Sequence, residues 1–419
     1  MHQIGRTRSG HLPTLLSALL YFDVSFMVWV LLGPLAPFID DQLRLSPAQR
    51  GLLVAIPLLG GSIFRPILGV LGDRLGGRKA GLLGLTVTLL PLALGCFFAH
   101  QIWELYVIGF LLGIAGASFA VALPMASKWY PPEKQGLVMG VAAAGNSGTL
   151  LATLFAPRLA QHYGYHVVFA LVAIPVLAVL VVFALCAKDS PYSAAVPTRS
   201  DYARVLRQSD AWWFCFFYSL TFGGFVGLSS YLAIFFSDQY RVSHVRAADL
   251  TTIVVVAGSF LRPVGGWLAD RLGGYRFLLL LLSAATASFV AISTIPSLVF
   301  AVTLLFFVMG MLGMGNGAVF QLVPLRFARE VGILTGIVGA AGGLGGFFIP
   351  FGLGLLRQRT GSYGAGFALY ATVFLSAGLV LLALGRRWIT TWPADRARIA
   401  AIFAVRLPES LRGGVPAGE

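Results

Sequence analysis

The stretch GSIFRPILGVLGDRLGG, residues 61–77, recurs as GSFLRPVGGWLADRLGG at residues 258–274. The two copies lie 197 positions apart and agree at eleven of seventeen places, with Arg65 aligned to Arg262. One arginine in an apolar segment can be accidental, whereas two at equivalent positions indicate a shared role. The repeat therefore predicts a chain built from two equivalent halves.

The composition places most of the chain in lipid. The 419 residues are 58% hydrophobic and 11% charged, whereas a soluble domain is about half apolar and about a quarter charged. Twelve apolar stretches of roughly 18 to 25 residues can be read, each long enough to cross about 30 Å of hydrocarbon. They begin near residues 14, 50, 80, 103, 135, 166, 211, 248, 276, 297, 330 and 364. We expect an all-α membrane protein with twelve transmembrane helices, the first of them retained rather than cleaved as a signal peptide.

The net charge of +14 is distributed as in a membrane protein and not as in a nucleic-acid-binding one. If alternate loops are assigned to the cytoplasm from the N-terminus onward, they and the tails hold 21 of the 30 lysines and arginines, while the opposite loops hold 7. This positive-inside pattern predicts that both termini are cytoplasmic. The basic tail, residues 387–419, is expected either on anionic headgroups or in solvent.

Few residues suggest enzymatic or metal chemistry. The three cysteines have no paired spacing and are expected to be small buried apolar residues. All six histidines lie in predicted tails or loops, and no HExxH, GxSxG, CxxC or P-loop pattern occurs. We therefore expect no cofactor, no metal and no enzymatic activity.

The 197-residue offset extends beyond the opening stretch. DDQLRLS at 40–46 aligns with SDQYRVS at 237–243, and Tyr21 aligns with Tyr218. Six spans in each half give both halves the same orientation, as in major facilitator transporters, whose substrate site lies near the membrane midplane between the halves. The predicted domains are an N-terminal bundle (1–187), a cytoplasmic linker (188–210), a C-terminal bundle (211–386) and the tail (387–419).

Each half also carries a GxxxDRxGG element at its second cytoplasmic loop, similar to the signature loop of the major facilitator superfamily. Its charged residues are Asp73 and Arg74 in one copy and Asp270 and Arg271 in the other. We expect these residues to act in gating, because carboxylates at helix ends can pair with basic residues when the cytoplasmic side is closed. The alternative is surface charge that only sets the topology.

The burial of Arg65 and Arg262 must be compensated by favourable interactions, because placing an arginine at the centre of a membrane costs on the order of 3 kcal/mol of free energy. Pseudo-symmetry would place them facing each other, an arrangement that repels unless an anion lies between them. A guanidinium matches a planar oxyanion, so the predicted guest is a small, flat, oxygen-bearing anion. The alternative is that each arginine holds its own half together through carbonyls or Asp23.

Two further stretches carry a family resemblance. GVAAAGNSG at 140–148 and GMGNGAVFQLVPLRFAREVGILTGIVGAAGGLGGFFIP at 313–350 resemble the nitrate signatures of the nitrate/nitrite porter family of the major facilitator superfamily. The resemblance covers essentially the whole chain, and the second signature is long and specific. The first departs from the usual form at Ala143 and Ala144, where the family has a glycine.

The resemblance implies a nitrate site. Arg65 and Arg262 would bind nitrate and Asn146 would donate its amide to a nitrate oxygen, while aromatic rings exclude tetrahedral anions. The implied aromatic walls are Phe119, Tyr218 and Phe222, for which ordinary packing is the alternative. Asn316 is expected either to line the pore or to make a helix–helix hydrogen bond.

Motion and energy coupling are assigned to separate residues. Gly342 and Gly343 lie in a glycine-rich stretch that would let helices approach and slide during gating. Nitrate entering a negative-inside cell climbs about 2.3 kcal/mol per 100 mV, so uptake needs a driving ion. Asp23 is the one carboxylate well inside a predicted span, which favours proton–nitrate symport with Asp23 as the proton carrier. If Asp23 is only a static partner, nitrate/nitrite exchange becomes the better hypothesis.

Other functions stay open at this point. The carrier could move another small oxyanion or carboxylate, or the chain could be a nitrate sensor or a unit coupled to nitrate reduction. The family and the compact loops predict a multi-pass protein of the bacterial inner membrane that works as a monomer.

Overall fold

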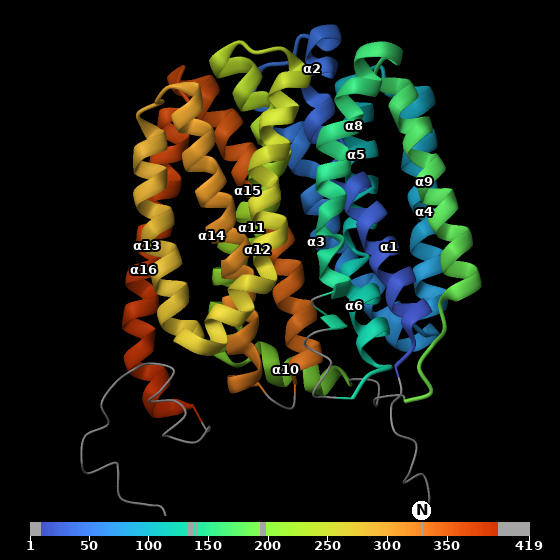
Figure 1. Ribbon diagram of the computed structural model, residues 1–419, viewed down its shortest axis with the longest axis vertical. Coiled ribbons are helices and arrows are strands. Elements are labelled where there is room, and N and C mark those ends of the chain that lie inside the picture. The colour runs from blue at the N-terminus through green and yellow to red at the C-terminus, as the bar shows by residue number, and fades with distance from the viewer. Residues whose placement is uncertain (1–9, 132–137, 140, 193–197, 328–329, 393–419) are drawn as a thin grey trace, which may run out of the picture.

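The computed structural model describes residues 10–131, 138–139, 141–192, 198–327 and 330–392. Within these ranges the chain is helical and contains no strand. The helices form two bundles side by side, one from the N-terminal half and one from the C-terminal half (Figure 1).

The described elements divide between the two halves, and more of the spans are interrupted in the N-terminal half. The N-terminal bundle contains α1 (Leu12–Trp29), α2 (Leu32–Leu43), α3 (Pro47–Leu75), α4 (Gly77–Phe98), α5 (Ile102–Gly116), α6 (Phe119–Ser127), the 3-10 turn η1 (Ala144–Ser147), α8 (Gly148–Tyr163) and α9 (Tyr165–Cys186). After the short helix α10 (Arg199–Leu206), the C-terminal bundle contains α11 (Ser209–Tyr240), α12 (His244–Leu272), α13 (Gly274–Ser293), α14 (Leu298–Arg326), α15 (Val331–Thr360) and α16 (Gly364–Thr391).

Eleven of the described helices are long and apolar enough to cross a membrane, with α1 and α2 counted as one span and α5 and α6 as another. The predicted fifth span differs because η1 interrupts it, leaving α8 with 16 residues. Part of that span, residues 132–137 and 140, lies outside the described residues.

The repeated sequence stretches end and begin helices at matched places. Gly76 ends α3 with φ 89° and Gly273 ends α12 with φ 84°, conformations that favour glycine because it has no Cβ. Arg44 and Arg241, also 197 positions apart, both take positive φ angles, 51° and 52°. The local backbone therefore repeats together with the sequence.

Several spans are interrupted inside the N-terminal bundle. α1 gives way to α2 after Trp29, α5 to α6 after Gly116, and η1 precedes α8. Irregular backbone at membrane depth is tolerated where it is buried in protein or lines a cavity. The break after Gly116 frees a backbone carbonyl that contacts the site described below.

The two bundles meet along few helices. α15 packs along both α3 and α11, while α8 lies against α12 and α2 against α11. α15 therefore belongs to the C-terminal half and also forms much of the contact with the N-terminal half.

The short helix α10 lies at one end of the molecule, called here the α10 end. α1 begins there and α16 ends there (Figure 1).

At the start of α10, hydrogen bonds from the side chain and the backbone N–H of Thr198 lower the pKa of the Asp201 carboxyl. Residues 193–197 of the predicted linker and residues 393–419 of the predicted tail lie outside the described residues, and the predicted domain boundaries remain predictions.

Candidate anion-binding site

Arg65 lies in the interior, with 2% of its surface exposed. Its Nε donates a 2.9 Å hydrogen bond to the carbonyl of Gly116, and its Nη1 donates to the carbonyl of Gly339 on α15. Its Nη2 is buried and has no hydrogen-bond partner among the described residues. One terminal nitrogen of Arg65 is thus left for a ligand.

The break between α5 and α6 explains why Gly116 can accept this bond. In a continuous helix the N–H of Ala120 would donate to Gly116, but here it donates to Ala117, and the N–H of Ser118 donates to Ala115. The carbonyl of Gly116 is thereby released from the helix, and Arg65 takes it up. This compensates part of the cost of burying a guanidinium.

Arg262 approaches the same ring as Arg65. The central guanidinium carbon of Arg65 lies 5.3 Å from the ring centre of Phe119, and that of Arg262 lies 6.0 Å from it. Nη1 of Arg262 is also buried without a hydrogen-bond partner among the described residues. The structure therefore brings the two aligned arginines, one from each half, to the same aromatic side chain.

Aromatic rings enclose the two arginines. Tyr218 and Phe222 of α11 stack in parallel, with ring centres 5.1 Å apart and planes 2° apart, and Phe222 lies 5.1 Å from the Arg65 guanidinium. Phe320 of α14 packs edge-on against Tyr218 at 4.9 Å and lies 6.0 Å from Arg262. Phe320 is not among the residues predicted from the sequence, although it falls within the second signature stretch, residues 313–350.

Two asparagines have no visible partners. Asn146 on η1 and Asn316 on α14 are both fully buried, and neither the oxygen nor the nitrogen of their side-chain amides is hydrogen-bonded among the described residues. η1 packs against α1 and α12, and Asn316 lies one helical turn before Phe320. Buried amides are normally hydrogen-bonded, so both point to a polar ligand or to water in this region.

Asp23 lies beside η1 and is not ion-paired. Oδ1 of Asp23 accepts a 2.6 Å hydrogen bond from the hydroxyl of Ser147, the residue after Asn146. None of the ion pairs among the described residues includes Asp23. The described contacts thus hold Asp23 through a hydroxyl and not through an arginine.

The predicted hinge glycines lie at close helix contacts. A Cβ on Gly342 would stand 2.7 Å from Cδ1 of Tyr218 and 2.8 Å from Cδ1 of Phe222. A Cβ on Gly343 would stand 3.2 Å from the backbone nitrogen of Ser62 on α3. These contacts account for the glycines as packing positions, while their part in gating remains a prediction.

Among the described residues, the predicted gating charges at the α10 end make no ion pair between the two halves, and their part in gating remains a prediction. Asp73 pairs at 3.9 Å with Lys128 of the same half, and Arg271 lies over the ring of Trp267 at 3.9 Å. Arg74 and Asp270 form no ion pair among the described residues.

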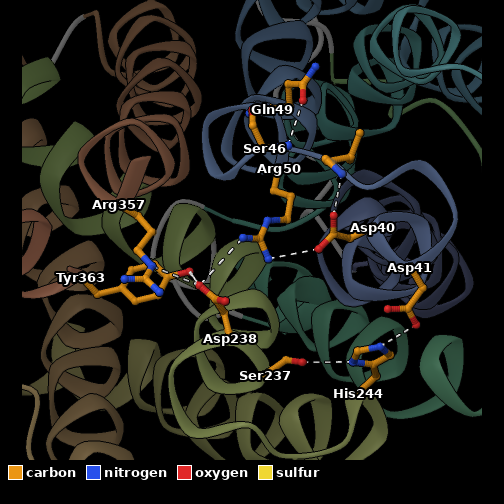
Figure 2. Close-up of polar contacts among 11 residues, drawn as sticks. Asp40, Asp41, Ser46, Gln49, Arg50, Ser237, Asp238, His244, Arg357 and Tyr363 are labelled. Atoms are coloured by element: carbon orange, nitrogen blue, oxygen red, sulfur yellow. Dashed lines mark hydrogen bonds and ion pairs between the residues drawn. The ribbon is translucent and has the colours of Figure 1, made fainter. Parts of the chain in front are cut away.

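Ion pairs join the halves at the opposite end, where no gating residue is predicted from the sequence. Arg50 of α3 lies 3.2 Å from Asp40 of α2 and 3.8 Å from Asp238 of α11 (Figure 2). Asp238 also accepts hydrogen bonds from Nε of Arg357 at 3.2 Å and from the hydroxyl of Tyr363 at 2.7 Å. We call these five residues the outer cluster.

Two further contacts support the outer cluster. Nε2 of His244 lies 2.8 Å from Oδ2 of Asp41, and its Nδ1 lies 3.0 Å from the hydroxyl of Ser237 (Figure 2). Arg158 of α8 pairs with Asp249 of α12 at 2.8 Å. Among the described residues, ion pairs between the two bundles occur only at this end, so the charge contacts that hold the halves together lie on the side away from α10.

Comparison with known proteins agrees with the geometry. Residues 18–350 match the Major Facilitator Superfamily. The chain is 35% identical over 365 residues to the "Nitrite extrusion protein" of Bacillus subtilis (strain 168), covering 85% of this chain and 90% of that protein. It is 37% identical over 337 residues to the "Probable nitrate/nitrite transporter NarK2" of Mycobacterium tuberculosis, covering 79% and 85%.

A solved structure supports the fold alone. The partially occluded inward open conformation of the xylose transporter XylE from E. coli superposes with a TM-score of 0.70 at 15% sequence identity, covering 89% of this chain and 98% of that one.

Proposed function

Because the chain belongs to the nitrate/nitrite porter family of the major facilitator superfamily, we propose that it carries nitrate and nitrite across the membrane by alternating access. It is a multi-pass membrane transporter and not an enzyme. The names of two relatives supply the substrate class, and the site around Phe119 supplies the chemistry.

One observation carries the proposal. Arg65 and Arg262 approach one ring from opposite halves, and each keeps a buried terminal nitrogen without a partner among the described residues. Two guanidinium groups this close repel each other, and a flat monovalent anion that accepts from both relieves the repulsion. Asn146 provides a further unpaired donor, since its side-chain amide is not hydrogen-bonded among the described residues.

Alternating access fits the position of the arginines between the halves. The outer cluster closes the site from the side away from α10. The positive-inside distribution assigns the α10 end to the cytoplasm, so the proposed state is closed toward the outside. The proposal includes a bacterial inner-membrane location, cytoplasmic termini and a monomer as the working unit.

For energy coupling we propose proton–nitrate symport with Asp23 as the proton carrier. Asp23 is partly buried, lies outside every described ion pair, and bonds to Ser147 beside Asn146. A carboxylate next to a candidate ligand residue is placed so that its charge and the anion can influence each other.

Nitrate/nitrite exchange is the second candidate, favoured by a different observation. Among the described residues, no carboxylate pairs with Arg65 or Arg262. An empty site therefore keeps two uncompensated positive charges, which makes it unfavourable for the empty carrier to change from one open state to the other. In exchange an anion is bound in both directions, so the carrier never has to make this change with an empty site.

Proteoliposomes containing the purified protein decide between these proposals. An imposed inward proton gradient, without internal nitrite, should concentrate labelled nitrate if symport operates, whereas exchange requires internal nitrite. Unlabelled nitrate and nitrite should compete with the label, and formate and chlorate should compete less. Absence of saturable nitrate uptake under both conditions would refute nitrate transport itself.

A further inference from the structure

Trp29, at the end of α1, lies directly against Arg65. The guanidinium carbon of Arg65 is 4.9 Å from the centre of the Trp29 ring, and Trp29 has no exposed surface. A desolvated guanidinium over an indole is a favourable cation–π contact, for which tryptophan is the best of the aromatic residues.

The indole is held in one orientation. Its Nε1 donates a 2.7 Å hydrogen bond to the carbonyl of Pro57 on α3. Pro57, Gly61 and Arg65 are spaced by four residues and therefore lie on one face of α3. Trp29 spans this face, with its hydrogen bond at one end and the guanidinium at the other.

Glycines form the slot in which the indole lies. A Cβ on Gly61 would stand 2.7 Å from the Trp29 ring, and a Cβ on Gly116 would also collide with it. Gly116 is in addition the residue whose carbonyl accepts from Nε of Arg65. The backbone that binds Arg65 and the backbone that confines Trp29 are therefore partly the same.

We propose that Trp29 is a positioning residue for anion binding, an inference that rests on the proposed function. The indole face and the carbonyls of Gly116 and Gly339 fix the plane of the Arg65 guanidinium, so that Nη2 is presented to the anion. Without the indole the guanidinium can rotate, and the anion must then bear the cost of ordering it.

The competing explanation is that Trp29 only packs the core. Loss of packing lowers the thermal stability of the folded carrier but leaves the nitrate affinity of the remaining folded molecules unchanged. Loss of positioning raises the nitrate KM. The two explanations therefore predict different nitrate affinities, and not only different amounts of folded protein.

The test compares Trp29→Leu with Trp29→Phe and with Trp103→Leu, a control at an exposed tryptophan. Nitrate counterflow gives KM, and the nitrate-induced rise in the unfolding temperature of the purified protein gives binding. Trp29→Leu should raise KM about tenfold, because the anion must then also order the guanidinium, at a cost of about 1.4 kcal/mol. Trp29→Phe keeps an aromatic face and should recover most of the affinity, and Trp103→Leu should behave as wild type.

Gly61→Ala provides a second route if Trp29→Leu fails to fold. Its methyl group would displace the indole while Arg65 and Trp29 are both retained, so KM should again rise. A wild-type KM in a folded Trp29→Leu or Gly61→Ala variant would overturn the positioning role. If the wild-type protein itself shows neither saturable counterflow nor a nitrate-induced shift, the proposed function fails instead.

Discussion

The hydroxyl of Ser147 donates a 2.6 Å hydrogen bond to Oδ1 of Asp23. This bond joins the carboxylate in the first span to the 3-10 turn that carries Asn146. A change of charge at Asp23 can therefore reach the candidate anion site through two adjacent residues.

Asp23→Asn should separate coupling from binding. The amide keeps the size of the side chain but cannot carry a proton, so accumulation driven by an inward proton gradient should be lost. Counterflow of nitrate, which needs no net proton movement, should stay within about threefold of wild type, since Asp23 makes no direct charge pair with the arginines. Ser147→Ala is the matched control, because it removes the hydrogen bond and retains the carboxylate. Acid-driven accumulation by Asp23→Asn would show that another group carries the proton.

Arg65→Lys should abolish most nitrate transport even though it conserves the charge. Arg65 uses separate nitrogens for Gly116 and Gly339 and keeps Nη2 free. A lysine has a single nitrogen and cannot satisfy both carbonyls and an anion in this geometry. Losing one partner of a buried, charged hydrogen-bond set costs about 3 kcal/mol, or roughly a hundredfold in kcat/KM.

Arg262→Lys is expected to act in the same direction, and Arg276→Lys at an exposed position of α13 serves as the control for expression and insertion. Counterflow in proteoliposomes with matched protein content gives kcat/KM. Rates near wild type in either site variant would contradict a site built on two guanidinium groups.

The sequence predicts candidate site residues, but it does not predict the contacts that hold their side chains in place. The repeat identifies Arg65 and Arg262, because a matched pair in apolar surroundings is visible without a structure. Trp29 and the Gly116 carbonyl are not visible, since an aromatic in an apolar span resembles any packing residue and a helix break at Gly116 has no proline to mark it. The supporting contacts depend on tertiary geometry that no local pattern encodes.

The outer cluster is only partly predictable from the sequence. Asp40 and Asp238 both lie in the repeated stretches 40–46 and 237–243, so the sequence marks this region as structured alike in the two halves. It does not reveal that Arg50, outside the repeat, bridges the two carboxylates. The GxxxDRxGG charges are the more recognisable motif, but the described ion pairs across the halves are at the other end.

Arg50→Ala should open the outer side. Each partly exposed ion pair is worth about 1 kcal/mol, so loss of the Arg50–Asp238 bridge should raise the population open to the outside about fivefold. The measurement is labelling of Ser62→Cys by an impermeant maleimide added from outside, in a background without the three native cysteines. Ser62 lies between the halves, where its hydroxyl donates to the carbonyl of Ala340.

Asp201→Asn is the control for that experiment, because the Asp201–Arg204 ion pair lies within α10 and does not connect the two bundles. Its labelling rate should equal that of the parent. Unchanged labelling in Arg50→Ala would mean that the outer cluster does not hold the closed state.

Gly342→Ala and Gly336→Ala form a matched pair on α15 that tests whether close contact at the site matters. A methyl group at Gly342 would stand 2.7 Å from Tyr218 and 2.8 Å from Phe222, whereas at Gly336 nothing lies within 4 Å. Both changes replace a helical glycine and gain about 0.5 to 1 kcal/mol of helix propensity.

Only Gly342→Ala must displace the stacked rings, which lie beside Arg65 and Arg262. It should lower nitrate kcat/KM about tenfold or more, at a cost of about 1 to 3 kcal/mol for overpacking. Gly336→Ala should leave transport unchanged and raise the unfolding temperature slightly. Equal transport by the two variants would show that the Tyr218–Phe222 stack can move without loss, and would remove it from the walls of the site.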